Sequence, residues 1–346
     1  LAEVSVSRDA SLAYYLADGR LDLVYKVEVS GAEADGTPVR DTVLVNAVDG
    51  SIALRMPHIH SAEKRNVYNL KNRTTLSQAT LARTEGGAPS SDAVVNSNYD
   101  LLGTVYDCYS SLFGRDSING AGSTLKSYVH YSKNYNNAYW DGAEMVYGDG
   151  DGSTFSNLAN SLDVTAHELT HGVTSFESNL TYSGESGGLN ESLSDIFGNV
   201  CEWFRDGKVV SANTWKVGED VFTPSKAGDA LRYLNDPAKD GASVDFYSST
   251  VGSKDVHYSS GLPNLVFFLL SEGGTHPRGK STVDVTGIGI EKAAQVFYLA
   301  NTSYLTSSSK FAGARTATLS AAQQLGLSQA EIDSVTNAWA AVGVGS

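Results

Sequence analysis

Basic residues are scarce in this sequence. Its 346 residues include 25 Lys and Arg against 39 Asp and Glu, which gives a formal net charge of -14. A surface this acidic repels phosphate backbones, so the charge argues against a nucleic-acid partner. The same acidity favours cations that take oxygen ligands, such as calcium.

Long apolar runs are also missing. A membrane-spanning helix needs about 20 consecutive apolar residues, and LPNLVFFLL (Leu262–Leu270) is too short, so it predicts a buried helix. The first residues, LAEVSVSRDA, contain neither the basic region nor the apolar core of a signal peptide. We therefore expect no membrane association. Composition leaves open whether the protein is cytoplasmic or starts after a removed signal.

Cysteine is rarer still, with only Cys108 and Cys201. Each lies in an apolar run of helical character, and sequence alone cannot place the two within bonding distance. The prediction is two packed free thiols rather than a disulfide. Two cysteines are too few to indicate the redox compartment.

The chain is long enough for two or three packed units. Within residues 1–58, LDLVYKVEVSG and DTVLVNAVDGSIALRMP alternate apolar and polar residues, and a turn-prone GAEADGTP separates them. Alternation with a period of two predicts strands, so we expect a small antiparallel sheet. Residues 59–71 lack clear periodicity and are predicted to be a linker.

The rest of the chain divides into a β-rich part, residues 72–162, and a helical part, residues 163–346. The first contains a predicted long helix that begins at Asp92, followed by Tyr- and Gly-rich strands. In the second, Ser328 and Glu331 form a capping-box pattern before the last helix. This order predicts an α+β protein.

The segment HELTH, residues 167–171, carries the first chemical signal. On a helix, His167 and His171 lie one turn apart on one face, so both imidazoles can reach one metal ion. Glu168 projects towards the same open side, where it can take a proton from a metal-bound water. The remaining ligand must come from elsewhere in the chain.

The segment NESLSD supplies a candidate, because Glu191 and Asp195 also lie one helical turn apart. Two histidines, one glutamate and a water form the open arrangement of a catalytic zinc site. We predict that Glu191 is the third ligand and that Asp195 accepts the second ring N–H of a ligand histidine. The alternative is a solvated acidic helix face.

From about Asn66 to its end, the chain resembles the thermolysin-like neutral zinc metallopeptidases. The matching segments occur in the family's order and spacing: NNAYWDGAEMVYGDGDG, AHELTHGVTS, LTYSGESGGLNESLSDIFG, VGEDVFTP, DALRYLNDPAKDG and DVHYSSG. The resemblance implies a β-rich N-terminal lobe, a mainly helical C-terminal lobe and an active-site cleft between them. The HELTH helix would lie at the floor of this cleft.

The resemblance also implies roles for individual residues. Its metal site consists of His167, His171 and Glu191 as zinc ligands, Glu168 as general base, and Asp195 and Asn190 as hydrogen-bond partners of the two histidines. Tyr182 and His257 would donate hydrogen bonds to the oxyanion. Asp255 would orient His257; some relatives carry this Asp five residues before the His, where this chain has Gly252.

The substrate site follows from the same resemblance. Arg232 would hold a substrate carbonyl, and Asn137 with the backbone of Ala138 would bind the substrate main chain like an added strand. The pocket for the residue after the scissile bond would be lined by Phe155, Leu158, Val164, Val217, Val221 and Leu231. All six are apolar, so we expect cleavage on the amino side of Leu, Ile or Phe.

Calcium is the second implied ion, because Asp163, Glu202 and Glu219 match carboxylates that hold calcium in relatives. Thr214 and Lys216 stand where some relatives have acidic residues, so we expect one calcium here and not two. Asn213 would add an oxygen. Thr223 and Asp229 resemble a further calcium loop, and this possibility stays open, whereas DGDG (residues 149–152) is interpreted as a Gly-rich turn.

Residues 1–58 resemble the C-terminal part of the family's prosegment, a small sheet domain of the PepSY type. Such a prosegment would assist folding and inhibit the peptidase until it is cut between His58 and Lys71. A precursor implies secretion, with the signal and upstream prosegment absent from this chain. The alternative is a permanently attached accessory domain, and we expect a monomer.

Together these features predict a secreted zinc endopeptidase made as a precursor. Zinc would activate its water and polarise the scissile carbonyl, and Glu168 would pass the water proton to the leaving amine. The alternatives are a zinc exopeptidase, for which no terminus-binding acidic cluster is evident, and a non-catalytic zinc-binding module. The other histidines, His58, His60, His130 and His276, are interpreted as structural.

Overall fold

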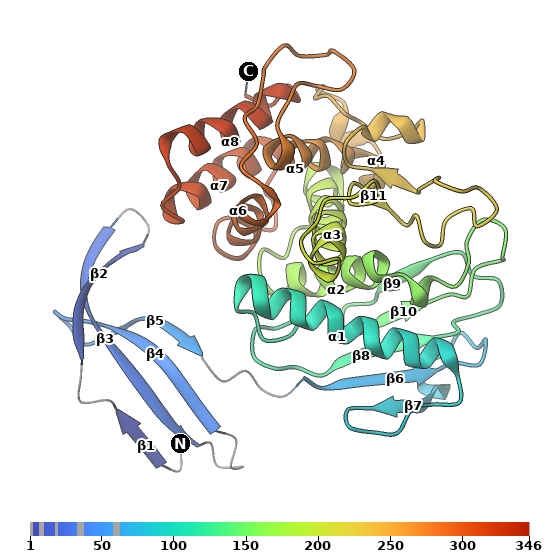
Figure 1. Ribbon diagram of the computed structural model, residues 1–346, viewed down its shortest axis with the longest axis horizontal. Helices are drawn as coiled ribbons and strands as arrows, with labels where there is room; N and C mark the ends of the chain where they lie inside the picture. The colour runs from blue at the N-terminus through green and yellow to red at the C-terminus, as the bar shows by residue number, and fades with distance from the viewer. Residues whose placement is uncertain (1–2, 7–9, 18–19, 33–37, 58–62, 346) are drawn as a thin grey trace. The chain divides into compact units, whose positions relative to one another are not determined.

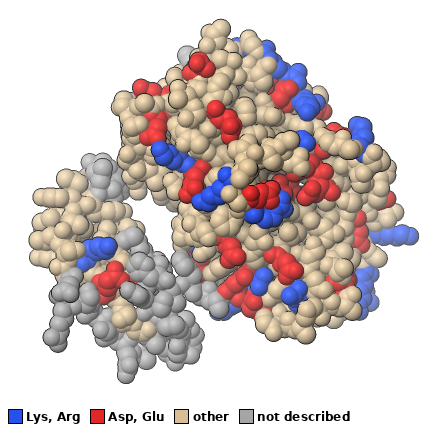
Figure 2. All heavy atoms as spheres, in the orientation of Figure 1, with Lys and Arg blue, Asp and Glu red and all other residues tan. Residues whose placement is uncertain are grey.

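A computed structural model describes residues 3–6, 10–17, 20–32, 38–57 and 63–345. The chain divides into two compact units, Leu1–Ala62 and Glu63–Ser346. No described helix is long and apolar enough to cross a bilayer. Acidic and basic side chains are interspersed on the face of the second unit that Figure 2 shows.

In the first unit, the described residues form a sheet of five antiparallel strands (Figure 1). They are β1 (Glu3–Val6), β2 (Ser11–Ala17), β3 (Arg20–Ala32), β4 (Pro38–Asn46) and β5 (Ile52–Pro57). The long strand β3 pairs with β1, β2 and β4, and β4 pairs with β5. The predicted sheet is therefore present, and β1 and β2 extend it.

The second unit contains a mixed sheet in the order β7-β6-β8-β10-β9. Its strands are β6 (Arg65–Asn69), β7 (Thr80–Thr84), β8 (Leu125–Val129), β9 (Ala138–Trp140) and β10 (Met145–Tyr147). Strand β6 pairs with β7 on one edge and with β8 on the other, whereas β9 is an edge strand. Because β6 lies inside the predicted linker 59–71, the connection is shorter than the sequence indicated.

Helix α1 (Ala93–Phe113) packs across this sheet (Figure 1). It begins where the sequence predicts, because the Asp92 side chain accepts the Val94 N–H at 3.0 Å as an N-cap. It ends at Gly114, whose φ of 66° belongs to the left-handed region that glycine adopts without strain.

Seven further helices and a short strand pair complete the second unit as described. They are α2 (Leu162–Phe176), α3 (Gly184–Arg205), α4 (Val256–Ser259), α5 (Gly261–Glu272), α6 (Ile290–Ser303), α7 (Phe311–Gln324), α8 (Gln329–Ala341), β11 (Lys216–Val217) and β12 (Arg232–Tyr233). Single 3-10 turns lie at Leu76–Gln78, Leu158–Asn160, Pro237–Asp240 and Val251–Ser253. The capping box of Ser328 and Glu331 is confirmed, and α5 is the predicted buried helix.

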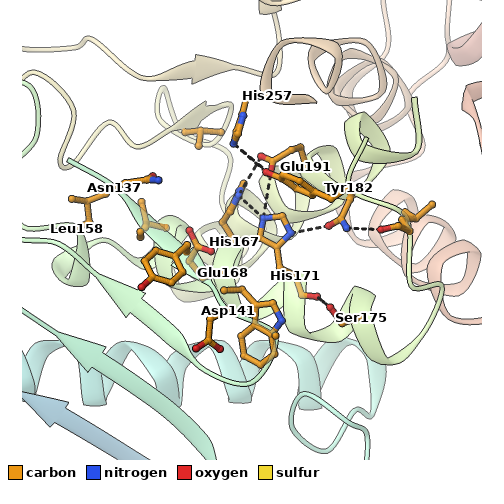
Figure 3. Close-up of a pocket in the computed structure, with 18 of the residues that line it drawn as sticks. Asn137, Asp141, Leu158, His167, Glu168, His171, Ser175, Tyr182, Glu191 and His257 are labelled. Atoms are coloured by element: carbon orange, nitrogen blue, oxygen red, sulfur yellow. Dashed lines mark hydrogen bonds and ion pairs between the residues drawn. The ribbon is translucent and has the colours of Figure 1, made fainter. Parts of the chain in front are cut away.

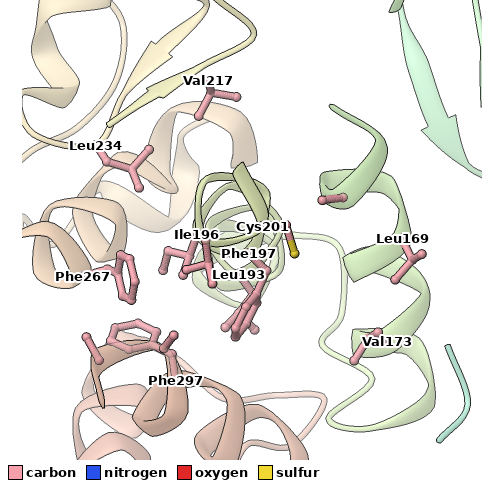
Figure 4. Close-up of a cluster of buried hydrophobic side chains, with 14 of the residues drawn as sticks. Leu169, Val173, Leu193, Ile196, Phe197, Cys201, Val217, Leu234, Phe267 and Phe297 are labelled. Carbon is pink, nitrogen blue, oxygen red and sulfur yellow. The ribbon is translucent and has the colours of Figure 1, made fainter. Parts of the chain in front are cut away.

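Helix α3 is the centre of the helical core (Figure 4). Every residue from 186 to 203 is buried. Leu193, Ile196 and Phe197 point into the apolar cluster that α2, α5 and α6 complete around it. A helix that is buried all round has no water for its polar side chains, so these must find partners or bind a ligand.

Cys108 and Cys201 form a disulfide, so the prediction of two free thiols was wrong. Cys108 lies on α1 and Cys201 on α3, and their Cα atoms are 5.5 Å apart. This distance is typical of disulfides. The two cysteines are 93 residues apart in sequence, and their contact arises from the packing of two helices, which periodicity cannot reveal.

Candidate active site

A cavity of about 860 Å³ opens in the second unit. Helix α2 contributes Val164, His167, Glu168, His171 and Ser175 along its length. The rest of the wall comes from β9, from α3, from the loops before α2 and after β11, from the loop between α2 and α3, and from His257 and Ser307. Figure 3 shows the labelled side chains converging on this space.

The three predicted zinc ligands meet at one point. The Nε2 atoms of His167 and His171 are 3.1 Å apart. Glu191, from α3, places Oε2 at 3.5 Å from the first and Oε1 at 3.3 Å from the second. Donors that surround a tetrahedral zinc at about 2.0–2.1 Å lie roughly 3.3 Å from one another, so the spacing fits this ion.

The hydrogen bonds around the histidines also fit a cation. The Nδ1 atom of His167 lies 2.9 Å from Asp195 Oδ1, and that of His171 lies 2.7 Å from Asn190 Oδ1. Both Nδ1 atoms therefore donate, which leaves the two Nε2 lone pairs facing each other. Glu191 Oε2 is buried and accepts no hydrogen bond from any described residue. A divalent ion between the two Nε2 atoms and Glu191 would coordinate all three ligand groups.

Asp195 accepts more hydrogen bonds than the sequence predicted. Arg232 donates to it twice, at 2.8 and 2.6 Å, and Asn264 donates at 2.9 Å. Burial raises the pKa of Asp195, but Arg232 and His167 outweigh this effect and hold the pKa below its usual range. Sequence reasoning missed Asn264, although an amide within the apolar run of α5 was a usable signal.

Glu168 is buried beside the metal donors without joining them. Burial raises its pKa, and the neighbouring His167 and His171 oppose this only in part. A carboxylate whose pKa is moved towards neutrality is a better match for proton transfer at physiological pH. Its environment therefore suits a general base.

Tyr182 and His257 lie next to each other, beside the predicted metal ligands (Figure 3). The Tyr182 hydroxyl donates to Glu191 Oε1 and lies 3.2 Å from His257 Nε2. Burial and the charge of Glu191 raise the pKa of Tyr182, so the hydroxyl stays protonated as a donor. Asp255 contacts His257 Nδ1 at 2.8 Å, which is the predicted orienting contact.

The apolar end of the cavity contains five of the six predicted pocket residues: Phe155, Leu158, Val164, Val217 and Leu231. Val221 is the sixth, and it does not reach the cavity. It is buried and does not line the cavity, because its backbone bonds to Ser156 and Gly218 hold it within the packed wall. Asn137, Ala138 and Arg232 also line the cavity.

A second group of acidic residues lies behind this site. Asp163, Glu202 and Glu219 bring carboxylate oxygens within 4.8 Å of one another. Burial, followed by mutual repulsion, raises the pKa of Glu202 and Glu219. One oxygen of each, Glu202 Oε1 and Glu219 Oε2, is buried without a hydrogen bond from any described residue. These oxygens fit calcium, which prefers carboxylate ligands.

The other predicted calcium oxygens have protein partners. Asn213 Oδ1 accepts from Lys216 Nζ at 2.9 Å. Asp229 accepts from Thr223 at 2.9 Å and from Lys226 at 3.2 Å. These contacts favour a hydrogen-bonded turn over a further calcium loop at Asp229.

Two of the remaining histidines have ordinary structural partners. His130 bridges Asp149 at 2.7 Å and Asp92 at 3.0 Å, and His276 is buried against the Asp245 carbonyl at 3.0 Å. His58 and His60 lie outside the described residues.

A cleft with two helical histidines, a glutamate from a second helix and a buried glutamate beside them defines the class of zinc metallopeptidases. The comparisons with known proteins agree. The family described as thermolysin metallopeptidase, catalytic domain, matches residues 42–175, and the thermolysin metallopeptidase, alpha-helical domain, matches residues 178–344. The chain therefore belongs to the thermolysin metallopeptidase family.

Individual relatives support this assignment. Bacillolysin from Bacillus cereus is 46% identical over 283 residues, which are 80% of this chain and 48% of that protein. Thermolysin from Alicyclobacillus acidocaldarius subsp. acidocaldarius is 42% identical over 283 residues, covering 80% and 50%. The chain thus spans about half the length of the curated relatives it matches.

A solved structure shows the same fold. The precursor of protealysin, a metalloproteinase from Serratia proteamaculans, superposes with a TM-score of 0.70 at 33% identity. The match covers 83% of this chain and 89% of that chain. The predicted α+β fold, with a sheet-rich N-terminal region and a helical C-terminal region, is confirmed.

Proposed function

We propose that this protein is a zinc endopeptidase that cleaves peptide bonds on the amino side of bulky apolar residues. The observation that carries the proposal is the convergence of His167, His171 and Glu191, with Glu168 buried beside them, in a cavity large enough for a peptide. His167, His171 and Glu191 would hold the zinc. When bound, zinc supplies a Lewis acid that polarises a carbonyl and acidifies a water.

Side chains and backbone of the protein transfer the proton, stabilise the oxyanion and bind the substrate. Glu168 accepts the proton of the attacking water and delivers it to the leaving amine. Tyr182 and His257 donate hydrogen bonds where the oxyanion develops. The free edge of β9 binds the substrate main chain as an added strand, beside Asn137.

The apolar pocket selects the residue after the scissile bond. Its wall is mainly apolar and contains Phe155, Leu158, Val164, Val217 and Leu231. The neighbouring Arg232 is already paired with Asp195. A charged side chain would lose its hydration there without compensation. On a panel of peptides that differ at this position, we expect Leu, Ile and Phe to be cleaved, and preference for Asp or Lys would contradict the proposal.

The decisive variant is Glu168→Gln. It keeps the shape of the site and all three metal donors, so zinc content should stay the same. Turnover should fall by about 10²–10⁴ because the base is lost. Glu272→Gln removes the same charge from an exposed position outside the cavity and serves as the control. Full peptidase activity of the Glu168→Gln protein would overturn the assignment.

We also propose that Asp163, Glu202 and Glu219 hold a structural calcium ion. Glu219 Oε2 and Glu202 Oε1 support this assignment, because both are buried without a hydrogen bond; Glu202 Oε1 has only an ion pair with Arg205 at 3.5 Å. The site would join α2, α3 and the turn after β11.

Residues 1–58 are proposed to be part of a prosegment that assists folding and inhibits the peptidase. The similarity to a solved precursor supports this, as does the division of the chain into a compact sheet unit and a separate compact unit that contains the catalytic residues. Secretion is proposed on the same basis and on the disulfide, since disulfides persist mainly in oxidising compartments. A monomer remains our expectation.

A further inference from the structure

His130 lies between two carboxylates and does not line the cavity itself. It follows strand β8, and its Nδ1 atom is 2.7 and 2.9 Å from the two carboxylate oxygens of Asp149. Its Nε2 atom is 3.0 Å from Asp92 Oδ2. A ring nitrogen that faces a carboxylate must donate, and two donors require the charged imidazolium. Both contacts are therefore complete only while His130 carries its second proton.

Asp149 connects this histidine to a turn in the cavity wall. Its Oδ1 accepts the side-chain N–H of Asn157 at 2.6 Å. Asn157 caps the 3-10 turn that begins at Leu158, because its Oδ1 accepts the Ala159 N–H at 3.0 Å. Leu158 is one of the wall residues of the apolar pocket. Two side-chain hydrogen bonds thus lead from His130 to the residue that precedes Leu158.

The backbone beside Asp149 contacts the cavity wall in two places. The Gly148 carbonyl accepts the Leu158 N–H at 3.2 Å, and the Gly148 N–H donates to the Asn137 carbonyl at 3.0 Å. Leu158 and Asn137 both line the cavity (Figure 3). The segments pack closely here, since a Cβ added to Gly148 would be 2.0 Å from the Tyr135 carbonyl oxygen. The position of Asp149 therefore affects the pocket wall and the edge that binds the substrate main chain.

The charge of His130 depends on pH. Hydrogen bonding to Asp149 raises the pKa of His130, and partial burial opposes this only in part. Among the described residues, the charged groups that face the ring are Asp149, after β10, and Asp92, before α1. Asn69 of β6 donates to Asp92 at 2.7 Å and is uncharged. Because the pKa is raised, the contacts are complete below the ordinary value of about 6.5 and are lost as the pH rises through the raised value.

We propose that His130 is a positioning residue that keeps the apolar pocket in the shape that selects a bulky residue after the scissile bond. It acts through Asp149 and Asn157 and does not touch the substrate. The inference rests on the proposed peptidase function. When His130 loses its second proton, one ring nitrogen presents a lone pair to a carboxylate oxygen and the two repel each other. Asp149 is then held less firmly, and Leu158 packs less closely against the substrate side chain.

The test compares two peptides that are identical except for Leu or Ala after the scissile bond. The kcat/KM of each is measured with the zinc-loaded protein between about pH 6 and about pH 9. Titration of Glu168 and His257 affects both peptides alike, so the Leu-to-Ala ratio reports on the pocket. One methylene in an apolar pocket is worth about 10–200-fold, so loosening one wall should lower this ratio by about tenfold as the pH rises. A ratio that stays constant over this range would overturn the inference.

Three variants identify the titrating group. Asp92→Asn keeps an N-cap for α1 but removes one of the two charges that face His130, so the fall in the ratio should move to lower pH. His130→Gln should give the low ratio at every pH, with zinc content unchanged. Lys133→Gln removes a positive charge from an exposed position of the same loop, outside the cavity, and should keep the ratio and its pH dependence.

The outcomes separate this inference from the proposed function. An Asp92→Asn profile equal to that of the unmodified protein, or a high ratio in His130→Gln, would overturn the role of His130 alone. No hydrolysis of either peptide by the unmodified protein would overturn the proposed function as well.

Discussion

Single residues at the site serve more than one partner. Asp195 orients His167 and at the same time anchors Arg232 and Asn264, so one buried carboxylate links α2, α3, α5 and β12. Glu191 contacts both histidines and accepts from Tyr182. A substitution of either carboxylate would therefore disturb several groups. Tyr182, which only donates a hydrogen bond, can be substituted without removing a metal ligand.

Tyr182→Phe tests the oxyanion assignment. Removing one donor from an oxyanion site costs about 10²–10³ in kcat, so we expect a loss of that size in peptide hydrolysis assays. Zinc content, measured on the same preparation, should not change, because the three metal donors remain. Tyr258→Phe removes a hydroxyl from an exposed tyrosine outside the cavity and should leave kcat unchanged. Equal effects of the two variants would contradict the role of Tyr182.

At the scale of elements, α3 is fastened to its neighbours in two places. The disulfide joins it to α1 at Cys201, and the next residue, Glu202, belongs to the carboxylate group shared with α2 and the turn after β11. Both attachments lie on the part of α3 that follows Glu191. They fix the position of α3, which carries the third metal ligand, Glu191, relative to α1 and α2.

Replacing both cysteines by alanine should destabilise the second unit. A cross-link that closes a loop of about 100 residues stabilises by roughly 4–5 kcal/mol in the chain-entropy model. We expect a lower Tm in thermal unfolding, with kcat/KM at 25 °C unchanged because neither cysteine lines the cavity. The reduced, unmodified protein should match the variant. A Tm equal to that of the oxidised protein would contradict a stabilising role.

Calcium removal should lower stability more at pH 8 than at pH 5.5. The pKa of Glu219 is raised to about 8 by burial and by Asp163, above its value of about 4.3 in an unfolded chain. The folded state therefore binds more protons, and without a cation its stability falls as pH rises through this window. Calcium replaces those protons and should flatten the dependence.

The measurement is Tm against pH for zinc-loaded protein with and without added calcium. Glu202→Gln should reduce both the calcium effect and the pH dependence. Asp229→Asn changes the carboxylate of the hydrogen-bonded turn instead and should leave the calcium effect intact. A calcium effect of the same size at both pH values would argue against the carboxylate cluster as the site.

For the whole molecule, the boundary between the units limits where a precursor can be cut. Strand β6 is hydrogen-bonded on both edges, and the Lys64 carbonyl accepts the Leu125 N–H at 2.8 Å. A cut inside this strand would break the sheet that supports β9. We therefore expect N-terminal sequencing of matured protein to find a start at or before Arg65. A start between residues 66 and 71 would contradict this expectation.

The sequence alone determined the parts that depend on local spacing. One helical turn separates His167 from His171 and Glu191 from Asp195, so each pair shares a helix face in any fold that keeps those helices. The alternation in residues 20–57 likewise indicated strands, and Asp92 and Ser328 marked the starts of two helices. The ligand chemistry of a catalytic zinc site suggested that the two pairs form one site, and the resemblance to a family supported this.

Only the tertiary structure decided which distant segments touch. It brought Cys108 to Cys201, placed Asn264 on Asp195, put β6 where a linker was predicted and left Val221 outside the cavity. The physical reason is that backbone periodicity sets the angle of a side chain about its own element, whereas the distance between two elements depends on how all their buried faces pack together.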